Sequence, residues 1–122
     1  MSEQVDTRTF EKADEVRTFT NGRLELIRIG DREVGRTTFE PGWRWSNDVK
    51  PIAQTDLCQV HHVGYMLQGR MVVQMADGTE LELTAGSVSE IPPGHDAWIV
   101  GDETCVMVDW GGPSNYAKAP GS

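Results

Sequence analysis

The sequence predicts an all-β fold, built as one sandwich or barrel. Short runs rich in β-branched and apolar residues recur about every 8–12 residues, and Gly, Pro, Asn-Gly or Asp-Gly turns separate them. No segment sustains the apolar period of a helix. The chain has 122 residues, of which 38% are hydrophobic, so we expect one domain with one core.

The first part of the chain predicts a loose arm followed by a hairpin. Residues 1–20 are polar with scattered apolar positions, and we expect at most an edge strand or a short helical turn there. Asn21-Gly22 is a turn signal. Strands are predicted over residues 24–29 and 33–40, and the second ends at Pro41-Gly42.

Residues 43–55, WRWSNDVKPIAQT, have no clean period and carry two of the four tryptophans. Tryptophans in a loop usually pack onto other parts of the protein or line a site. We therefore expect a structured loop that covers one mouth of the fold.

The second half of the chain predicts a series of short strands. Residues 57–75 are β-rich but broken at Gly69, and Asp77-Gly78 is a strong hairpin signal. Further strands are predicted over residues 80–84, 88–91, 96–100 and 104–110. Residues 111–122 have the composition of a mobile tail. We therefore divide the chain into an arm (1–20), a barrel (21–110) and a flexible tail (111–122).

Charge and composition exclude several partners. The net charge is −8 and the pI about 4.7, which argues against nucleic acid and against an anionic membrane surface. No run of about 18 apolar residues is present, and the N-terminus lacks a signal-peptide pattern, so we expect no membrane span and a cytoplasmic location. Two cysteines, Cys58 and Cys105, are expected to be reduced.

Two motifs carry a family likeness. Gly86, five residues and then Pro92-Pro93-Gly94 form one motif, and His62 to Gly69 (HVGYMLQG) has the register of another. With these motifs the chain resembles a small single-domain cupin over roughly residues 34–110. The resemblance implies a double-stranded β-helix, or jelly-roll, barrel that binds a small molecule and forms a homodimer.

The resemblance also implies a divalent metal, held by an HxH pair, a glutamate and a later histidine. Those positions fall here on Asp56, Cys58, His62 and Ala97, while His95 lies two residues before Ala97. Three candidate ligands remain, Cys58, His62 and His95, and they suit one zinc, iron, manganese or nickel ion. No other cofactor is expected.

Strand parity separates the two adjacent histidines. On a strand over residues 57–63, Cys58 and His62 share the inner face and His61 faces outward, unless a bulge turns both histidines inward. Four residues on a strand span about 13 Å, so no direct contact of Cys58 with His62 is expected. The alternative without metal makes His62 a hydrogen-bonded histidine and Cys58 a small buried hydrophobe.

The candidate acid–base residues are His62, His95 and Glu90. An inward-facing Glu90 would lie opposite His62 and could have a raised pKa, whereas an outward-facing Glu90 would be a solvated surface group.

The candidate ligand-binding residues are aromatic side chains with one cation, namely Trp43, Arg44, Trp45, Tyr65 and Trp98. The tryptophans could line the barrel mouth while the guanidinium binds an anionic group. The alternative for the aromatic side chains is core packing.

Two functions from different classes follow. In the first, the barrel binds a small polar or anionic organic molecule and catalyses a proton transfer of isomerase or lyase type, with or without a metal. In the second, the chain is a non-catalytic ligand-binding or regulatory cupin module.

Overall fold

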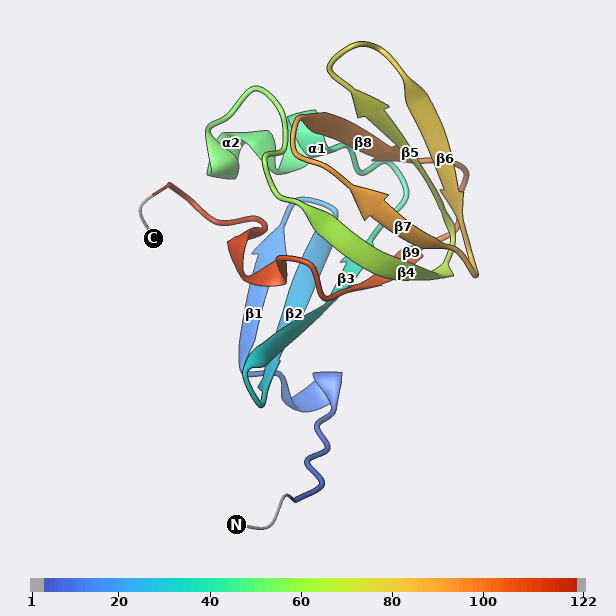
Figure 1. Ribbon diagram of the computed structural model, residues 1–122. Coiled ribbons are helices and arrows are strands. Elements are labelled where there is room, and N and C mark those ends of the chain that lie inside the picture. The colour runs from blue at the N-terminus through green and yellow to red at the C-terminus, as the bar shows by residue number, and fades with distance from the viewer. Residues whose placement is uncertain (1–3, 121–122) are drawn as a thin grey trace.

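The computed structural model describes residues 4–120, which form nine strands in two antiparallel sheets (Figure 1). The strands are β1 (Glu15–Phe19), β2 (Gly22–Ile29), β3 (Arg32–Phe39), β4 (His62–Gln68), β5 (Arg70–Met75), β6 (Glu80–Thr84), β7 (Val88–Ile91), β8 (His95–Ile99) and β9 (Cys105–Asp109). Short helices are η1 (Phe10–Lys12), α1 (Trp45–Asp48), α2 (Lys50–Ala53) and η2 (Pro113–Asn115). The all-β prediction is confirmed.

The two sheets enclose one apolar core. The larger sheet has the order β1-β2-β3-β9-β4-β7 and the smaller one β6-β5-β8. Met66 on β4 and Met107 on β9 pack from the larger sheet, and Met71 on β5 and Leu83 on β6 pack from the smaller one. In β3, β5 and β9, alternate residues face the space between the sheets, as the period of two requires.

Tight turns join the hairpins at the positions that the sequence indicates. Asn21, Gly30 and Gly78 have positive φ angles of 64°, 59° and 91°, in the region that Asn and Gly tolerate best. In the β5–β6 turn the backbone N–H of Thr79 donates to Asp77 Oδ1 over 2.9 Å.

The segment after β3 is partly helical, which periodicity did not indicate. The segment of residues 43–55 contains α1 and α2, and its side chains Trp43, Trp45 and Val49 are buried in the core. Helices of four residues are too short to show a period, so only the aromatic content indicated that this segment packs onto the barrel.

The two ends of the chain depart from the expected three-part division. β1 pairs with β2 along its whole length, so the arm is part of the larger sheet from Glu15 on. Residues 111–120 were expected to form a mobile tail, but Tyr116 is only 5% exposed. Arg17 on β1 holds this segment by donating from Nη1 to the carbonyl oxygens of Ser114 (2.6 Å) and Tyr116 (2.8 Å). Residues 121–122 of the predicted tail lie outside the described residues.

Within residues 4–120, no helix is both long enough and apolar enough to cross a membrane.

Gly69 is a position where the fold requires glycine. Its φ is +85°, and a Cβ there would lie 2.7 Å from Cys105 Cα and 2.9 Å from the Thr104 carbonyl oxygen. Gly69→Ala should lower the free energy of unfolding by about 2–5 kcal/mol, since backbone strain adds to a steric clash. Gly78→Ala, at φ +91° with nothing within 4 Å, is the matched control and should cost only about 1 kcal/mol. Urea denaturation measures both, and equal losses would contradict the argument.

Candidate functional site

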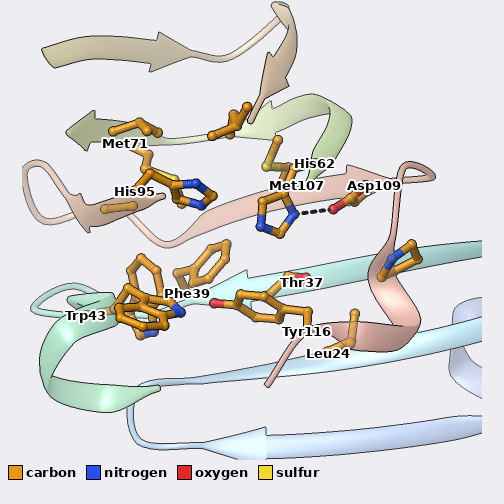
Figure 2. Close-up of a pocket in the computed structure, with 15 residues that line it drawn as sticks. Leu24, Thr37, Phe39, Trp43, His62, Met71, His95, Met107, Asp109 and Tyr116 are labelled. Carbon is orange, nitrogen blue, oxygen red and sulfur yellow. Dashed lines mark hydrogen bonds and ion pairs between the residues drawn. The ribbon is translucent and has the colours of Figure 1, made fainter. Parts of the chain in front are cut away.

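A small, mostly apolar cavity lies between the two sheets (Figure 2). About 30 Å³ of it is open to the centre of a water molecule. Leu24, Phe39, Met71 and Met107 line it on the apolar side, whereas His62, His95, Asp109 and Thr37 supply polar atoms. The cavity therefore suits a small molecule with an apolar body.

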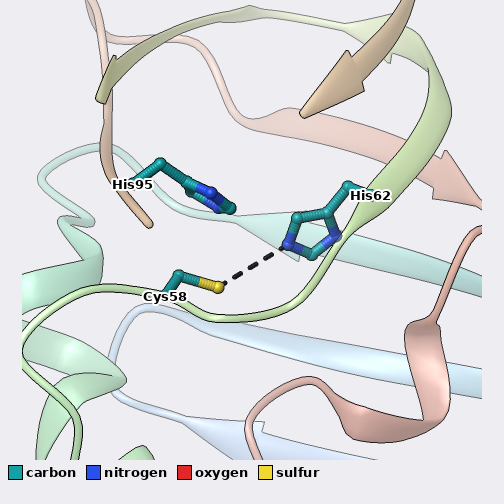
Figure 3. A group of neighbouring side chains, drawn as sticks. All are labelled: Cys58, His62 and His95. Carbon is teal, nitrogen blue, oxygen red and sulfur yellow. Dashed lines mark hydrogen bonds between the residues drawn. The ribbon is translucent and has the colours of Figure 1, made fainter. Parts of the chain in front are cut away.

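Three side chains that could hold a metal ion converge beside this cavity (Figure 3). The ligand atoms of Cys58, His62 and His95 lie within 4.8 Å of one another. Cys58 Sγ is 3.7 Å from His62 Nε2, and the rings of His62 and His95 meet edge to face at 5.3 Å between centroids. These are the three residues that we expected as metal ligands.

Cys58 reaches the cluster from an irregular segment. It forms an isolated bridge with His95, in which the Cys58 N–H donates to the His95 carbonyl over 2.7 Å and the His95 N–H donates back over 3.2 Å. β4 begins only at His62, so residues 59–61 are not part of a strand, and the spacing of an extended strand does not separate Cys58 from His62. The expectation that Cys58 and His62 do not touch is therefore wrong, because it assumed a strand from residue 57.

Both histidines of the cluster are held by their Nδ1 atoms. His62 Nδ1 donates to Asp109 Oδ2 over 2.6 Å, and His95 Nδ1 donates to the carbonyl oxygen of Pro92 over 2.8 Å. A carbonyl can only accept, so His95 carries its proton on Nδ1 and its Nε2 offers a lone pair when the ring is neutral. Such outer partners fix the tautomer and the orientation of metal-ligating imidazoles.

The electrostatics couple Cys58 to His62. Burial raises the pKa of the Cys58 thiol, but hydrogen bonds and charges of His62 and His95 act against burial and lower it to about 6. Burial lowers the pKa of His62, whereas Asp109 and Cys58 raise it to about 9. Near neutral pH the pair is therefore a thiolate beside an imidazolium.

This donor set fits a divalent transition metal. One thiolate and two imidazoles are ligands that zinc accepts, and three protein ligands are the usual number at catalytic zinc sites. Ligand atoms around a tetrahedral zinc ion lie roughly 3.5 Å apart, so the Cys58–His62 pair is already near that spacing. Metal binding would displace the Nε2 proton of His62, which makes the affinity dependent on pH.

Glu90 does not face the cavity. Its side chain is 69% exposed and pairs with His61 Nε2 at 2.9 Å on the outer surface. Of the two orientations that parity left open, the outward one is observed, and the assignment of Glu90 as an interior acid or base is corrected. His61 also lies outside, 49% exposed, because no bulge turns it inward.

Only two of the predicted aromatic and cationic ligand residues line the cavity. Trp43 and Trp45 do so. Arg44 lies outside, 41% exposed, with its guanidinium 4.4 Å from the Trp98 ring and 3.2 Å from Asp96. Tyr65 is exposed on the outer face of β4. The Trp98–Arg44 pair is thus an outer-face contact, and Arg44 does not reach the cavity.

Sequence reasoning missed two residues of the site, Asp109 and Tyr116. Asp109 is the one acid in the apolar strand TCVMVDW and shares the parity of the buried Cys105 and Met107, which could have identified it. Tyr116 lies in a segment of tail composition, where only the aromatic ring itself was a signal. Its ring packs edge to face on His62 at 5.5 Å between centroids.

Comparisons with known proteins identify the fold. No family model matches this chain, and no curated protein does so either. Solved structures do match: an uncharacterized conserved protein with a double-stranded β-helix domain from Klebsiella pneumoniae is 16% identical, with a TM-score of 0.60 over 93% of this chain and 94% of that one. The chain therefore has a double-stranded β-helix fold, as the two motifs predicted.

Two further structures are similar at the same level. A DUF1255 protein of unknown function from Acinetobacter is 16% identical, with a TM-score of 0.54 over 81% of this chain and 96% of that one. A putative ethanolamine utilization protein Q from Salmonella typhimurium is 15% identical, with a TM-score of 0.50 over 75% of this chain and 70% of that one. Identities this low show a common fold and leave the function to the site.

The two buried cysteines should differ in reactivity. Burial and Glu103 raise the pKa of Cys105 to about 12, so at about pH 7.5 roughly one thiol in 30,000 is ionised, whereas most Cys58 is thiolate. Iodoacetamide should therefore alkylate Cys58 first in metal-free protein, and its rate should fall as the pH drops through about 6. Mass spectrometry of timed samples measures this.

The Cys58→Ser variant should lose the fast alkylation phase, and Cys105→Ser should keep it. Faster labelling of Cys105 than of Cys58 in the parent protein would contradict the assigned ionisation.

Proposed function

We propose that the barrel binds a small organic molecule beside one divalent transition metal ion, held by Cys58, His62 and His95. The observation that carries this proposal is the orientation of the two histidines. Asp109 and Pro92 occupy their Nδ1 atoms, so that both Nε2 atoms remain for a common ion. The match to solved structures supports the barrel fold, whereas the proposed chemistry is argued from the side chains of the site.

We further propose that the chemistry is proton transfer on a carbonyl-containing substrate, of isomerase or lyase type. A bound metal ion would act as a Lewis acid that polarises a substrate oxygen. In the metal-free site, His62 Nε2 would hold and deliver a proton, since Asp109 fixes the ring through Nδ1 and favours its protonated form. A bound ion would take Nε2, and the ring would then serve as a ligand only. His95 is the second acid–base candidate, because its ring borders the same cavity.

A non-catalytic binding module is the second candidate function, and one observation favours it. With Glu90 outside, the cavity lacks one of the three acid–base residues that we had expected there. The two functions differ in the fate of the ligand: a binding module releases it unchanged, whereas an enzyme releases a product. A homodimer and a cytoplasmic location stay predictions.

Metal content tests the first part of the proposal. Protein purified without a histidine tag should contain a zinc, iron, manganese or nickel ion in about equal amount to the chain, measured by mass spectrometry of the metals.

Cobalt-loaded protein should show a thiolate-to-cobalt charge-transfer band, because Cys58 would be a ligand. Cys58→Ser should lose that band and Cys105→Ser should keep it. A parent protein that holds no ion and gains no thermal stability from any of them contradicts the metal site.

The outer partner of His62 gives a second test. Asp109→Asn should weaken metal binding about 10- to 100-fold, since the amide no longer fixes and charges the imidazole. Glu90→Gln is the matched control: it makes the same acid-to-amide change at the partner of the neighbouring histidine, and it should leave the affinity unchanged. Competition with a chelating dye measures both variants, and circular dichroism checks their folding. Equal affinities would show that Asp109 serves the fold alone.

A further inference from the structure

Two buried hydrogen-bond donors of the cavity wall have no partner. Among the described residues, Trp43 Nε1 and the Tyr116 hydroxyl are the buried side-chain atoms that make no hydrogen bond. Their side chains are 2% and 5% exposed, and both line the central cavity. In Figure 2 the Tyr116 ring reaches across the cavity toward the side on which Trp43 lies. The two atoms are thus cut off from water and directed to the same space.

Neither ring can turn its polar atom toward solvent without disrupting the fold. Trp43 packs on Phe39 with ring centroids 4.3 Å apart, and its backbone carbonyl accepts from the N–H of Ile99. Tyr116 packs edge to face on Phe19 at 5.9 Å, and Arg17 binds its carbonyl oxygen. The positions of both donors are therefore fixed by packing on opposite parts of the chain.

An unpaired buried polar group is costly, and native folds nearly always give it a partner. Here two such groups face one cavity, which indicates that a bound molecule pairs with them. The indole N–H can only donate, so the partner atom must be an acceptor. The tyrosine hydroxyl carries one O–H and can donate to that same acceptor.

The rest of the cavity limits the ligand further. Its walls are mostly apolar and include Leu24, Met71, Val73 and Ile91, and no Lys or Arg side chain of residues 4–120 lines it. The space is small as well. A sugar or a phosphate would leave several polar groups unpaired against these walls, whereas a compact apolar molecule with one oxygen acceptor would not.

We propose that Trp43 Nε1–H and Tyr116 O–H together bind the carbonyl-type oxygen of a small organic molecule whose body is apolar. The oxygen belongs to a ketone or to a carboxylate, and the test separates the two. This inference names the class of ligand for the proposed function. It rests on one part of that function, namely that the cavity binds an organic molecule. It does not require the metal.

Three probes with one branched skeleton test the proposal: 3-methyl-2-butanone, isobutyrate and 2,3-dimethylbutane. Saturation-transfer NMR titrations of the parent protein should show binding of the ketone or the carboxylate and weaker binding of the hydrocarbon. Tyr116→Phe should weaken binding of that oxygen probe about three- to tenfold, the effect of one lost hydrogen bond. Tyr65→Phe is the control, because it removes the same hydroxyl from the exposed tyrosine, and it should change nothing.

Thermal unfolding of the ligand-free variants separates a binding role from a structural one. Without ligand, Tyr116→Phe should melt at or above the temperature of the parent, since it removes an unpaired polar atom. In the parent, the indole N–H resonance of Trp43, assigned with Trp43→Phe, should move downfield on adding the oxygen probe. This second measurement tests the other donor of the pair in the parent protein itself.

Three results would overturn the inference: equal binding to Tyr116→Phe and the parent, hydrocarbon binding as tight as that of both oxygen probes, or a clear loss of stability in ligand-free Tyr116→Phe. If the cobalt-loaded protein still shows the thiolate-to-cobalt band, any of these results refutes this inference but not the metal site. Conversely, oxygen-probe binding that depends on Tyr116 in a protein that takes up no metal supports this inference and refutes the metal site.

Discussion

The buried carboxylate of Asp109 is the group on which the site depends. One oxygen accepts from His62 Nδ1 at 2.6 Å and the other from the backbone N–H of Gly111 at 2.8 Å. The first contact orients the ring whose Nε2 faces Cys58. The second turns the chain directly after β9, where the segment that carries Tyr116 begins. A single side chain at the end of a central strand thus fixes both a candidate metal ligand and a wall of the cavity.

This arrangement makes the polar network obligatory. Asp109 is 5% exposed, so its charge needs the nearby imidazolium, and Cys58 adds a thiolate on the other side of the same ring. Charges of alternating sign stabilise one another in a row, but removing one member leaves its neighbour buried and uncompensated, at a cost of about 3–5 kcal/mol. The contacts that hold the site together are therefore also contacts that the folded state requires.

The sequence predicts the fold well and the site in part, for physical reasons. Strand period and turn residues are local signals, so β2, β3, β6 and the motif glycines were predictable. Cys58, His62 and His95 were found as a set because the motifs place them in the barrel. Their contact was not predictable, since it depends on an irregular segment at residues 59–61 that has no periodic signature. The orientation of Glu90 could not be predicted either. On a short strand the sequence pattern does not show which face is buried, and the contact with His61 on the outer surface decides it.

The two sides of the cavity constrain the chemistry jointly. The ring of Tyr116 contacts that of His62, so an oxygen held by the tyrosine hydroxyl lies on a molecule beside the imidazole. If the bound group is a carbonyl, its donors withdraw electron density and acidify the adjacent C–H bond, while His62 and His95 are the imidazoles within the cavity. Since Glu90 is outside, these imidazoles are the acid–base candidates of the sequence analysis that remain in the cavity. The proposed proton transfer next to a carbonyl would use both the two hydrogen-bond donors, Trp43 and Tyr116, and the imidazoles. A binding module would use the two donors alone.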